Sequence, residues 1–135
     1  MYVMEDNALI EFVRQAIPDF MALYRFGSQT NGSARPDSDV DLAVLGRHPV
    51  PALRRFELAQ DLAARLHRDV DLVDLRSAST VMRMQIISTG ECLASPDDAA
   101  RREFEMYTYS SYARLNEERR DILKRIRASG LVYGG

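Results

Sequence analysis

Asp39 and Asp41, separated by a single valine, are the residues of this chain whose types and spacing point most directly to chemistry. In a β-strand, alternate side chains point to the same face, so both carboxylates would lie side by side. Like charges that close are unfavourable unless a cation lies between them. Mg²⁺ prefers oxygen ligands and usually completes its shell with phosphate oxygens and water. The spacing therefore predicts a metal site that carries a nucleotide.

A Gly-Ser pair, Gly27 and Ser28, precedes the aspartates in the stretch GSQTNGSARPDSDVDLAVL. Gly27 lets the backbone approach a phosphate closely, and Ser28 offers an amide and a hydroxyl. A helical turn that begins after Ser28 would add the positive end of its dipole. A Gly-Ser pair is common, so its weight comes from its distance to the aspartates. The combination predicts nucleotidyl transfer.

A third carboxylate would complete such a site. Two ions held by shared carboxylates can activate an attacking hydroxyl and stabilise the leaving pyrophosphate. Asp71 is favoured because it lies in the middle of an expected strand, between Val70 and Leu72. Asp69 lies on the same face and is the alternative, whereas Asp74 faces the other way. Asp69 and Asp71 could also simply cap the end of a strand.

Other nucleotide-binding and catalytic schemes are missing from the sequence. It contains no Walker-type glycine-lysine loop and no GxGxxG motif. His48, His67 and Cys92 have no metal-ligand spacing, which disfavours a zinc site or a histidine-dependent hydrolase. His67 falls at the end of an expected helix, where it suits the helix dipole.

Length and composition predict one cytoplasmic domain over residues 1–135. The net charge of -2 argues against direct nucleic-acid binding. No apolar run approaches the roughly 20 residues of a membrane span, and the N-terminus does not resemble a signal peptide. A lone cysteine suits a reducing compartment. Of the 18 basic residues, 17 are arginine, so phosphate contacts would use arginine or backbone amides.

Apolar periodicity predicts alternating helices and strands, hence an α/β or α+β domain with a small sheet covered by helices. The first helix contains Leu9 to Ile17 and ends at Pro18, and the second follows Pro49-Val50-Pro51 and continues through residue 67. The remaining expected elements are strands at 21–26, 40–45, 69–75 and 91–94, the last at an edge, and helices at 80–88 and 96–128.

The last helix carries a long apolar stripe, which predicts that it buries more than one face, with a kink as an open alternative. Its tyrosine-bearing part, from Tyr107 to Leu115, could instead form an interface. The stripe and the residues that widen it are Phe104, Tyr107, Tyr109, Tyr112, Leu115, Ile122, Leu123 and Ile126.

The residues from Gly27 to Leu42 match the pattern GSxxxGxxxxxSDxDL. With Asp71 in the later segment VDLVDL, the chain resembles the DNA polymerase β-like nucleotidyltransferase superfamily. Within it, the compact length and the long C-terminal helix look most like the minimal nucleotidyltransferase (MNT) antitoxins encoded beside HEPN-domain toxins. The resemblance covers nearly the whole chain and implies a polymerase β-like fold with a small mixed sheet.

The resemblance implies AMPylation: an ATP- and Mg²⁺-dependent transfer of AMP to a tyrosine hydroxyl of a cognate HEPN ribonuclease, which silences this toxin. Asp39, Asp41 and Asp71 would be the catalytic and metal-binding residues, with two Mg²⁺ ions expected. Gly27, Ser28 and Ser38 would be the nucleotide-binding residues, although Ser38 could equally be a turn residue.

Two alternatives remain open. The chain could transfer a nucleotide to a small molecule, although relatives of that kind generally carry a further helical region. It could also neutralise a toxin by binding alone, without catalysis. Three carboxylates favour catalysis, because a pure binding role would not require them.

Overall fold

The structure, a computed structural model, describes residues 2–27 and 39–130. Helices and strands alternate along these residues as the sequence predicts. Their bounds are α1 Tyr2–Ala16, β1 Ala22–Phe26, β2 Val40–Leu45, α2 Ala52–Leu66, β3 Val70–Asp74, α3 Thr80–Thr89, β4 Glu91–Ala94 and α4 Asp98–Ala128. The helical turn predicted after Ser28 lies outside the described residues. None of the helices in the described part combines the length and apolar character that a membrane crossing requires.

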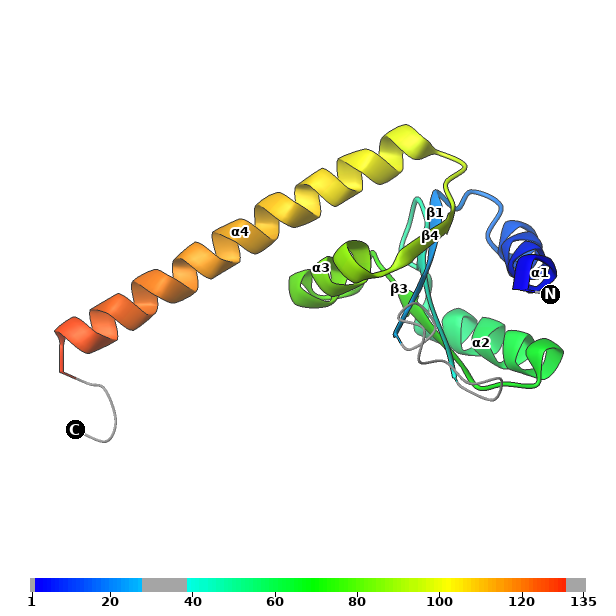
Figure 1. The fold of residues 1–135 in the computed structure, drawn as a ribbon, viewed down its shortest axis with the longest axis horizontal. Coiled ribbons are helices and arrows are strands. Elements are labelled where there is room, and N and C mark those ends of the chain that lie inside the picture. Colours follow the sequence, from blue (N-terminus) through cyan, green and yellow to red (C-terminus); the bar gives the residue numbers. More distant parts are fainter. Residues whose placement is uncertain (1, 28–38, 131–135) are drawn as a thin grey trace.

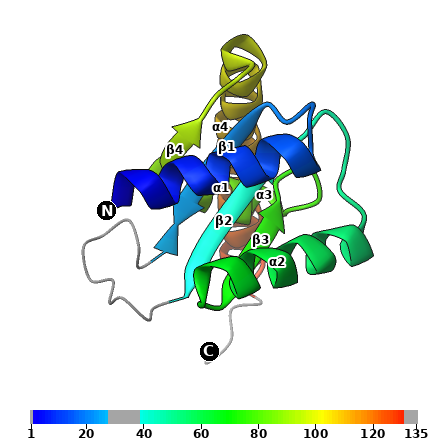
Figure 2. The ribbon, with the colours of Figure 1, turned by 90° about the vertical axis from the view of Figure 1, so that its right-hand side faces the viewer.

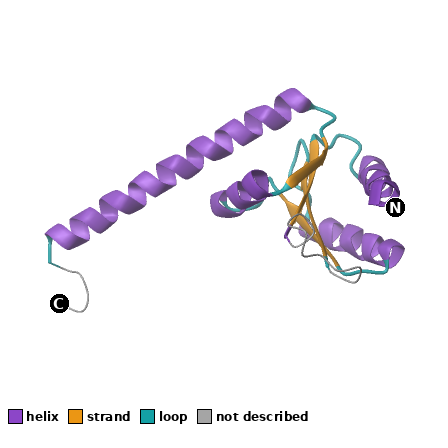
Figure 3. Cartoon of the chain, in the orientation of Figure 1, coloured by secondary structure: helices purple, strands orange, loops and turns teal. Residues whose placement is uncertain are grey.

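The four strands form one sheet (Figure 3). Their order is β3-β2-β1-β4. β1 pairs antiparallel with β2 and with β4, whereas β2 and β3 are parallel. Parallel neighbours need a crossover connection, which α2 supplies. β4 lies at one edge, as predicted, and β3 lies at the other. The expectation of a small mixed sheet covered by helices is confirmed.

Helices cover both faces of the sheet, with α1 and α2 on one side and α3 and the start of α4 on the other (Figures 1 and 2). Alternation along β2 supplies apolar side chains to both sides. Leu42 and Val44 pack in the cluster beneath α1 and α2. Ala43 and Leu45 pack with Ile86 of α3 in the other cluster. Asp41 shares the alternation of Ala43 and Leu45, so it lies on the α3 side of the sheet.

Local capping explains where several helices begin and end. Ser79 accepts a hydrogen bond from the Met82 amide at the start of α3, and Asp97 accepts one from the Ala100 amide at the start of α4. His67 ends α2 in the left-handed conformation, with a φ of 54°. It therefore occupies the helix terminus that the sequence indicates.

The prediction that α4 buries more than one face is wrong. Its buried residues are Phe104 and Thr108, both in its N-terminal half. Farther along, Ile122 and Leu123 are each about half exposed. Figure 1 shows the reason: α4 is one continuous, straight helix that passes α3 and then projects beyond the sheet. Periodicity shows which residues share a helix face, but it does not show what covers that face.

Candidate active site

The sheet topology gathers the predicted site residues at one end of three neighbouring strands. β1 runs antiparallel to β2, so the end of β1 lies beside the start of β2, and the parallel strand β3 starts there as well. In this register Phe26 is the partner of Asp41, and Asp41 is the partner of Asp71. Gly27 follows Phe26 directly, and Asp39 precedes β2. Residues from three separate segments therefore meet at this end.

Asp41 and Asp71 are direct neighbours across parallel strands, so both belong to the α3 face of the sheet. Asp41 is partly buried, whereas Asp39 and Asp71 are exposed. Burial raises the pKa of Asp41 above its ordinary value, and the negative charges of Asp71 and then Asp39 raise it further. The site thus concentrates negative charge where a cation would be stabilised.

Gly27 lies directly against the Asp41 carboxylate. Its φ is +78°, in the left-handed region that glycine adopts most easily. A Cβ atom built on Gly27 would overlap Oδ2 of Asp41. Both the backbone conformation and the close approach therefore favour glycine here. Gly27, at the end of β1, and the Asp41 carboxylate of β2 are therefore in direct contact.

Four further residues were considered for the site: Ser28, Ser38, Asp69 and Asp74. Ser28 and Ser38 lie outside the described residues. Asp69 is exposed just before β3, and its carbonyl accepts a hydrogen bond from the Val40 amide. Asp74 is buried on the opposite face of β3 from Asp71, as the alternation predicts.

Asp74 has a structural environment that sequence reasoning did not identify. Its carboxylate accepts hydrogen bonds from the Val50 amide at 2.9 Å, the Arg76 amide at 3.1 Å and the Ser77 hydroxyl at 2.8 Å. These contacts tie the segment before α2 to the turn after β3. The short spacing from Asp74 to Ser77 is the one local signal that could have indicated this turn.

The acidic residues suit a metal that arrives with a nucleotide. Within residues 2–27 and 39–130, no three histidine, cysteine or acidic side chains converge closely enough to hold a metal ion. Mg²⁺ does not need such a cage, because it commonly uses one or two carboxylates together with substrate phosphates and water. The neighbouring carboxylates of Asp41 and Asp71, with Asp39 beside them, fit this donor set.

Two arginines that the sequence analysis did not single out, Arg76 and Arg83, line a pocket at the other end of the sheet. Arginine is so frequent in this chain that composition gave no signal for these two. Their significance depends on which groups surround them, which is a property of the folded chain.

The arrangement of a glycine turn and strand-borne carboxylates on a mixed sheet is that of a nucleotidyltransferase. Residues 7–99 match the family model described as "Polymerase beta, Nucleotidyltransferase". The matched segment contains Gly27 and all three predicted site aspartates. The chain belongs to this family.

Within the family, the chain is similar to the protein adenylyltransferase MntA of Shewanella oneidensis. The two sequences are 40% identical over 131 residues, which cover 96% of this chain and 92% of the relative.

Two solved structures agree with this likeness. A toxin-antitoxin complex with AMP-PNP contains a chain that is 39% identical, with a TM-score of 0.80 and coverage of 90% of this chain and 98% of that one. A tri-AMPylated Shewanella oneidensis HEPN toxin in complex with an MNT antitoxin contains a chain that is 37% identical, with a TM-score of 0.79 and coverage of 94% and 99%. The predicted polymerase β-like fold and the MNT resemblance are confirmed.

Proposed function

We propose that this protein is an antitoxin that transfers AMP from ATP to a tyrosine hydroxyl of a cognate HEPN ribonuclease toxin and thereby neutralises it. The observation that carries the proposal is the meeting of Gly27, Asp41 and Asp71 at one end of the sheet. Similarity to MntA over nearly the whole chain supports AMP as the transferred group and a HEPN protein as the acceptor. Residues 1–135 would act as one minimal nucleotidyltransferase domain in the cytoplasm.

In this proposal each site residue has a separate role. The Gly27 amide and Ser28 hold the β- and γ-phosphates of ATP, and Ser38 is a further nucleotide-binding residue. Asp39 and Asp41 bind two Mg²⁺ ions, and Asp71 contributes the third carboxylate. Bound with ATP, the ions would offset the phosphate charge and favour attack at the α-phosphorus. The raised pKa of Asp41 supports a place for cations beside it, because they would relieve the repulsion from Asp71 and Asp39.

The transfer step is an in-line displacement. The acceptor oxygen forms a bond to the α-phosphorus while the bond from that phosphorus to the bridging oxygen of the β-phosphate breaks. Pyrophosphate leaves with the bonding electron pair. Asp71 receives the proton of the acceptor hydroxyl, a role that its exposure and its position beside Asp41 both support.

Neutralisation by binding alone remains a second candidate because much of α4 lies exposed. A helix that leaves its own domain with apolar residues uncovered suits contact with a partner. The two candidate functions are compatible, since a partner must be held before it is modified. Transfer to a small molecule has no comparable support in the structure.

Transfer of label from the α-phosphate of ATP to a cognate HEPN toxin tests the proposal. With Mg²⁺, wild-type protein should label this partner, and chelation of the metal should abolish labelling. The double substitution Asp39→Asn with Asp41→Asn should abolish labelling and preserve the fold. Asp61→Asn, which changes an exposed carboxylate on α2, is the matched control and should label normally. Protection of cells by wild-type protein without any labelling would support binding alone and contradict the enzymatic proposal.

A further inference from the structure

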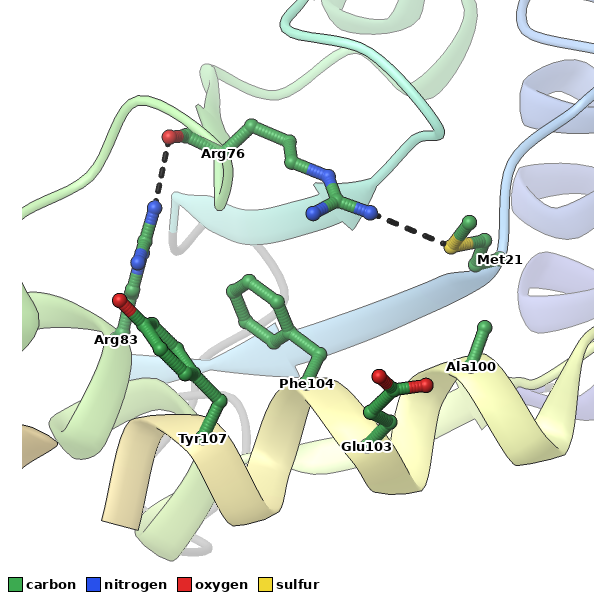
Figure 4. A pocket seen from close by; sticks show the side chains of 7 residues that line it. All are labelled: Met21, Arg76, Arg83, Ala100, Glu103, Phe104 and Tyr107. Carbon is green, nitrogen blue, oxygen red and sulfur yellow. Dashed lines mark hydrogen bonds between the residues drawn. The ribbon is translucent and has the colours of Figure 1, made fainter. Parts of the chain in front are cut away.

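A pocket of about 540 Å³ opens between α3 and α4 (Figure 4). Its place in the fold is at the far end of the sheet from the predicted site aspartates. Arg76, which follows β3, and Met21, which precedes β1, both line it. Asp71 and Gly27 occupy the opposite ends of these same two strands. A ligand in this pocket would therefore not compete with a nucleotide at the aspartates.

Two guanidinium groups are fixed in the wall of this pocket. Arg76 Nε donates to the Gly46 carbonyl at 2.8 Å, and Arg83 donates from Nε to the Leu75 carbonyl and from Nη2 to the Arg76 carbonyl, each at 2.7 Å. Both groups also lie over the Phe104 ring, 5.5 and 5.1 Å from its centroid. Their positions are set before any ligand arrives, which limits the entropy lost on binding.

Neither guanidinium forms an ion pair with a carboxylate in the described part of the chain. Of the ion pairs recorded among residues 2–27 and 39–130, none includes Arg76 or Arg83. Their hydrogen bonds to other residues go to backbone carbonyls and, from Arg76, to the Met21 sulfur at 3.6 Å. Each guanidinium carries five N–H donors, so several donors of each remain for an anionic ligand.

The surroundings of the pocket suit a protein surface. Tyr107 at the rim is 64% exposed, and the neighbouring Met106 is 67% exposed. Tyrosine, methionine and arginine are the residues enriched at protein–protein interfaces. From the pocket, α4 continues on the α3 side of the sheet, with Ile122 and Leu123 half exposed near its end (Figure 1). This surface extends well beyond the reach of a small ligand.

We propose that the pocket receives an aspartate or glutamate side chain of the protein acceptor, while apolar residues of that partner rest on α4. The inference rests on the proposed function, which supplies a protein partner. Asp41 and Asp71 belong to the same face of the sheet as α3 and α4. A partner docked there is therefore held on the side from which its hydroxyl must approach.

A carboxylate fits the charges better than a phosphate does. Glu103 also lines the pocket and is exposed, so it sets one negative charge against the two arginines. It repels a doubly charged phosphate more strongly than a singly charged carboxylate. An arginine fork can still hold a carboxylate through two parallel hydrogen bonds.

Affinity measurements between the full-length chain and the unmodified HEPN protein test the docking site. Arg83→Gln and Tyr107→Ala should each weaken binding by about tenfold or more. Glu103→Gln should tighten it, because the substitution removes a negative charge that lines the pocket. Arg102→Gln is the matched control, since Arg102 is an exposed arginine of α4 that pairs with Asp98 outside the pocket. AMP-PNP affinity, measured on every variant, should remain near wild type, and thermal unfolding shows that each variant is folded at the assay temperature.

The outcomes separate this inference from the proposed function. Unchanged affinity in both Arg83→Gln and Tyr107→Ala, weaker binding in Glu103→Gln, or no binding by wild-type protein would overturn the docking site. Saturable binding of inorganic phosphate that Arg83→Gln abolishes would also overturn it, because the pocket would then hold a small anion. If binding depends on Arg83 while no AMP is transferred, the docking site stands and the proposed function fails. If AMP is transferred and Arg83→Gln alters neither affinity nor KM for the partner, the proposed function stands and the docking site fails.

Discussion

Replacing Gly27 with alanine should damage the active site far more than the fold. The substitution has two separate effects. It places a Cβ on a residue with a φ of +78°, and it drives that atom into the Asp41 carboxylate. The first effect acts on stability, because the left-handed conformation is unfavourable for alanine. The second acts on catalysis. The atom that the new Cβ would overlap is Oδ2 of Asp41, and the Asp41 side chain can rotate away, which displaces its carboxylate from the site.

The two effects differ in size. A left-handed conformation costs a residue with a Cβ roughly 1–2 kcal/mol relative to glycine. Small domains are stable by about 5–15 kcal/mol, so the variant should stay folded at 25 °C with a Tm lowered by about 3–10 °C. A displacement of about 1 Å at a reacting centre can cost about a hundredfold in rate. Loss of folded protein cannot account for a decrease that large.

Two glycines of the same chain provide controls for the assay, which compares Tm with the rate of AMP transfer. Gly130 has a φ of +73° with open space around it, so Gly130→Ala repeats the backbone cost without touching a carboxylate. It should transfer AMP at the wild-type rate. A Cβ on Gly90 would overlap the backbone carbonyl of Ile86, so Gly90→Ala should mainly lower Tm. Wild-type transfer by Gly27→Ala would refute the reasoning about Gly27 and Asp41.

Three further substitutions test one site carboxylate and two buried polar contacts elsewhere in the fold. Because folding raises the pKa of Asp41, the folded chain holds that proton more tightly than the unfolded chain does. Asp41→Asn should therefore raise Tm at pH 7, and this gain should vanish below about pH 4, where the carboxyl is protonated in both states. Thermal unfolding across this pH range measures it, and an equal gain at both ends would contradict the argument. Asp74→Ala leaves three donors without their acceptor and should lower the free energy of unfolding by roughly 3 kcal/mol or more, as urea titration would measure. Tyr24→Phe removes the 2.7 Å hydrogen bond from Tyr24 Oη to Glu105 and should cost about 1 kcal/mol, with the transfer rate unchanged.

Local patterns in the sequence predicted the elements well. β2 and β4 begin and end at the predicted residues, and α3 extends one residue beyond its predicted end. β3 is one residue shorter at each end than predicted. Such features depend on backbone periodicity and on nearby stop signals such as Pro18, all of which can be read along the chain.

The candidate site was predictable in its residues but not in its arrangement. Alternation along a strand was enough to separate Asp71 from Asp74. It could not show that Asp41 and Asp71 are partners, because that depends on the pairing of β2 with β3 across the α2 crossover. The contact between Gly27 and Asp41 likewise requires the antiparallel register of β1 and β2.

The sequence by itself determined the order of elements, the carboxylates with their glycine turn, and the family resemblance. These features depend only on residue types and their spacing along the chain, so they can be read without the fold. Tertiary structure alone decided that α4 leaves Ile122 and Leu123 of its stripe half exposed. It also decided that Arg76 and Arg83 share a pocket with Phe104. The physical reason is that burial and charge neutralisation depend on which distant segments meet. Contacts between distant segments depend on packing across the sheet, and local sequence patterns do not predict this packing.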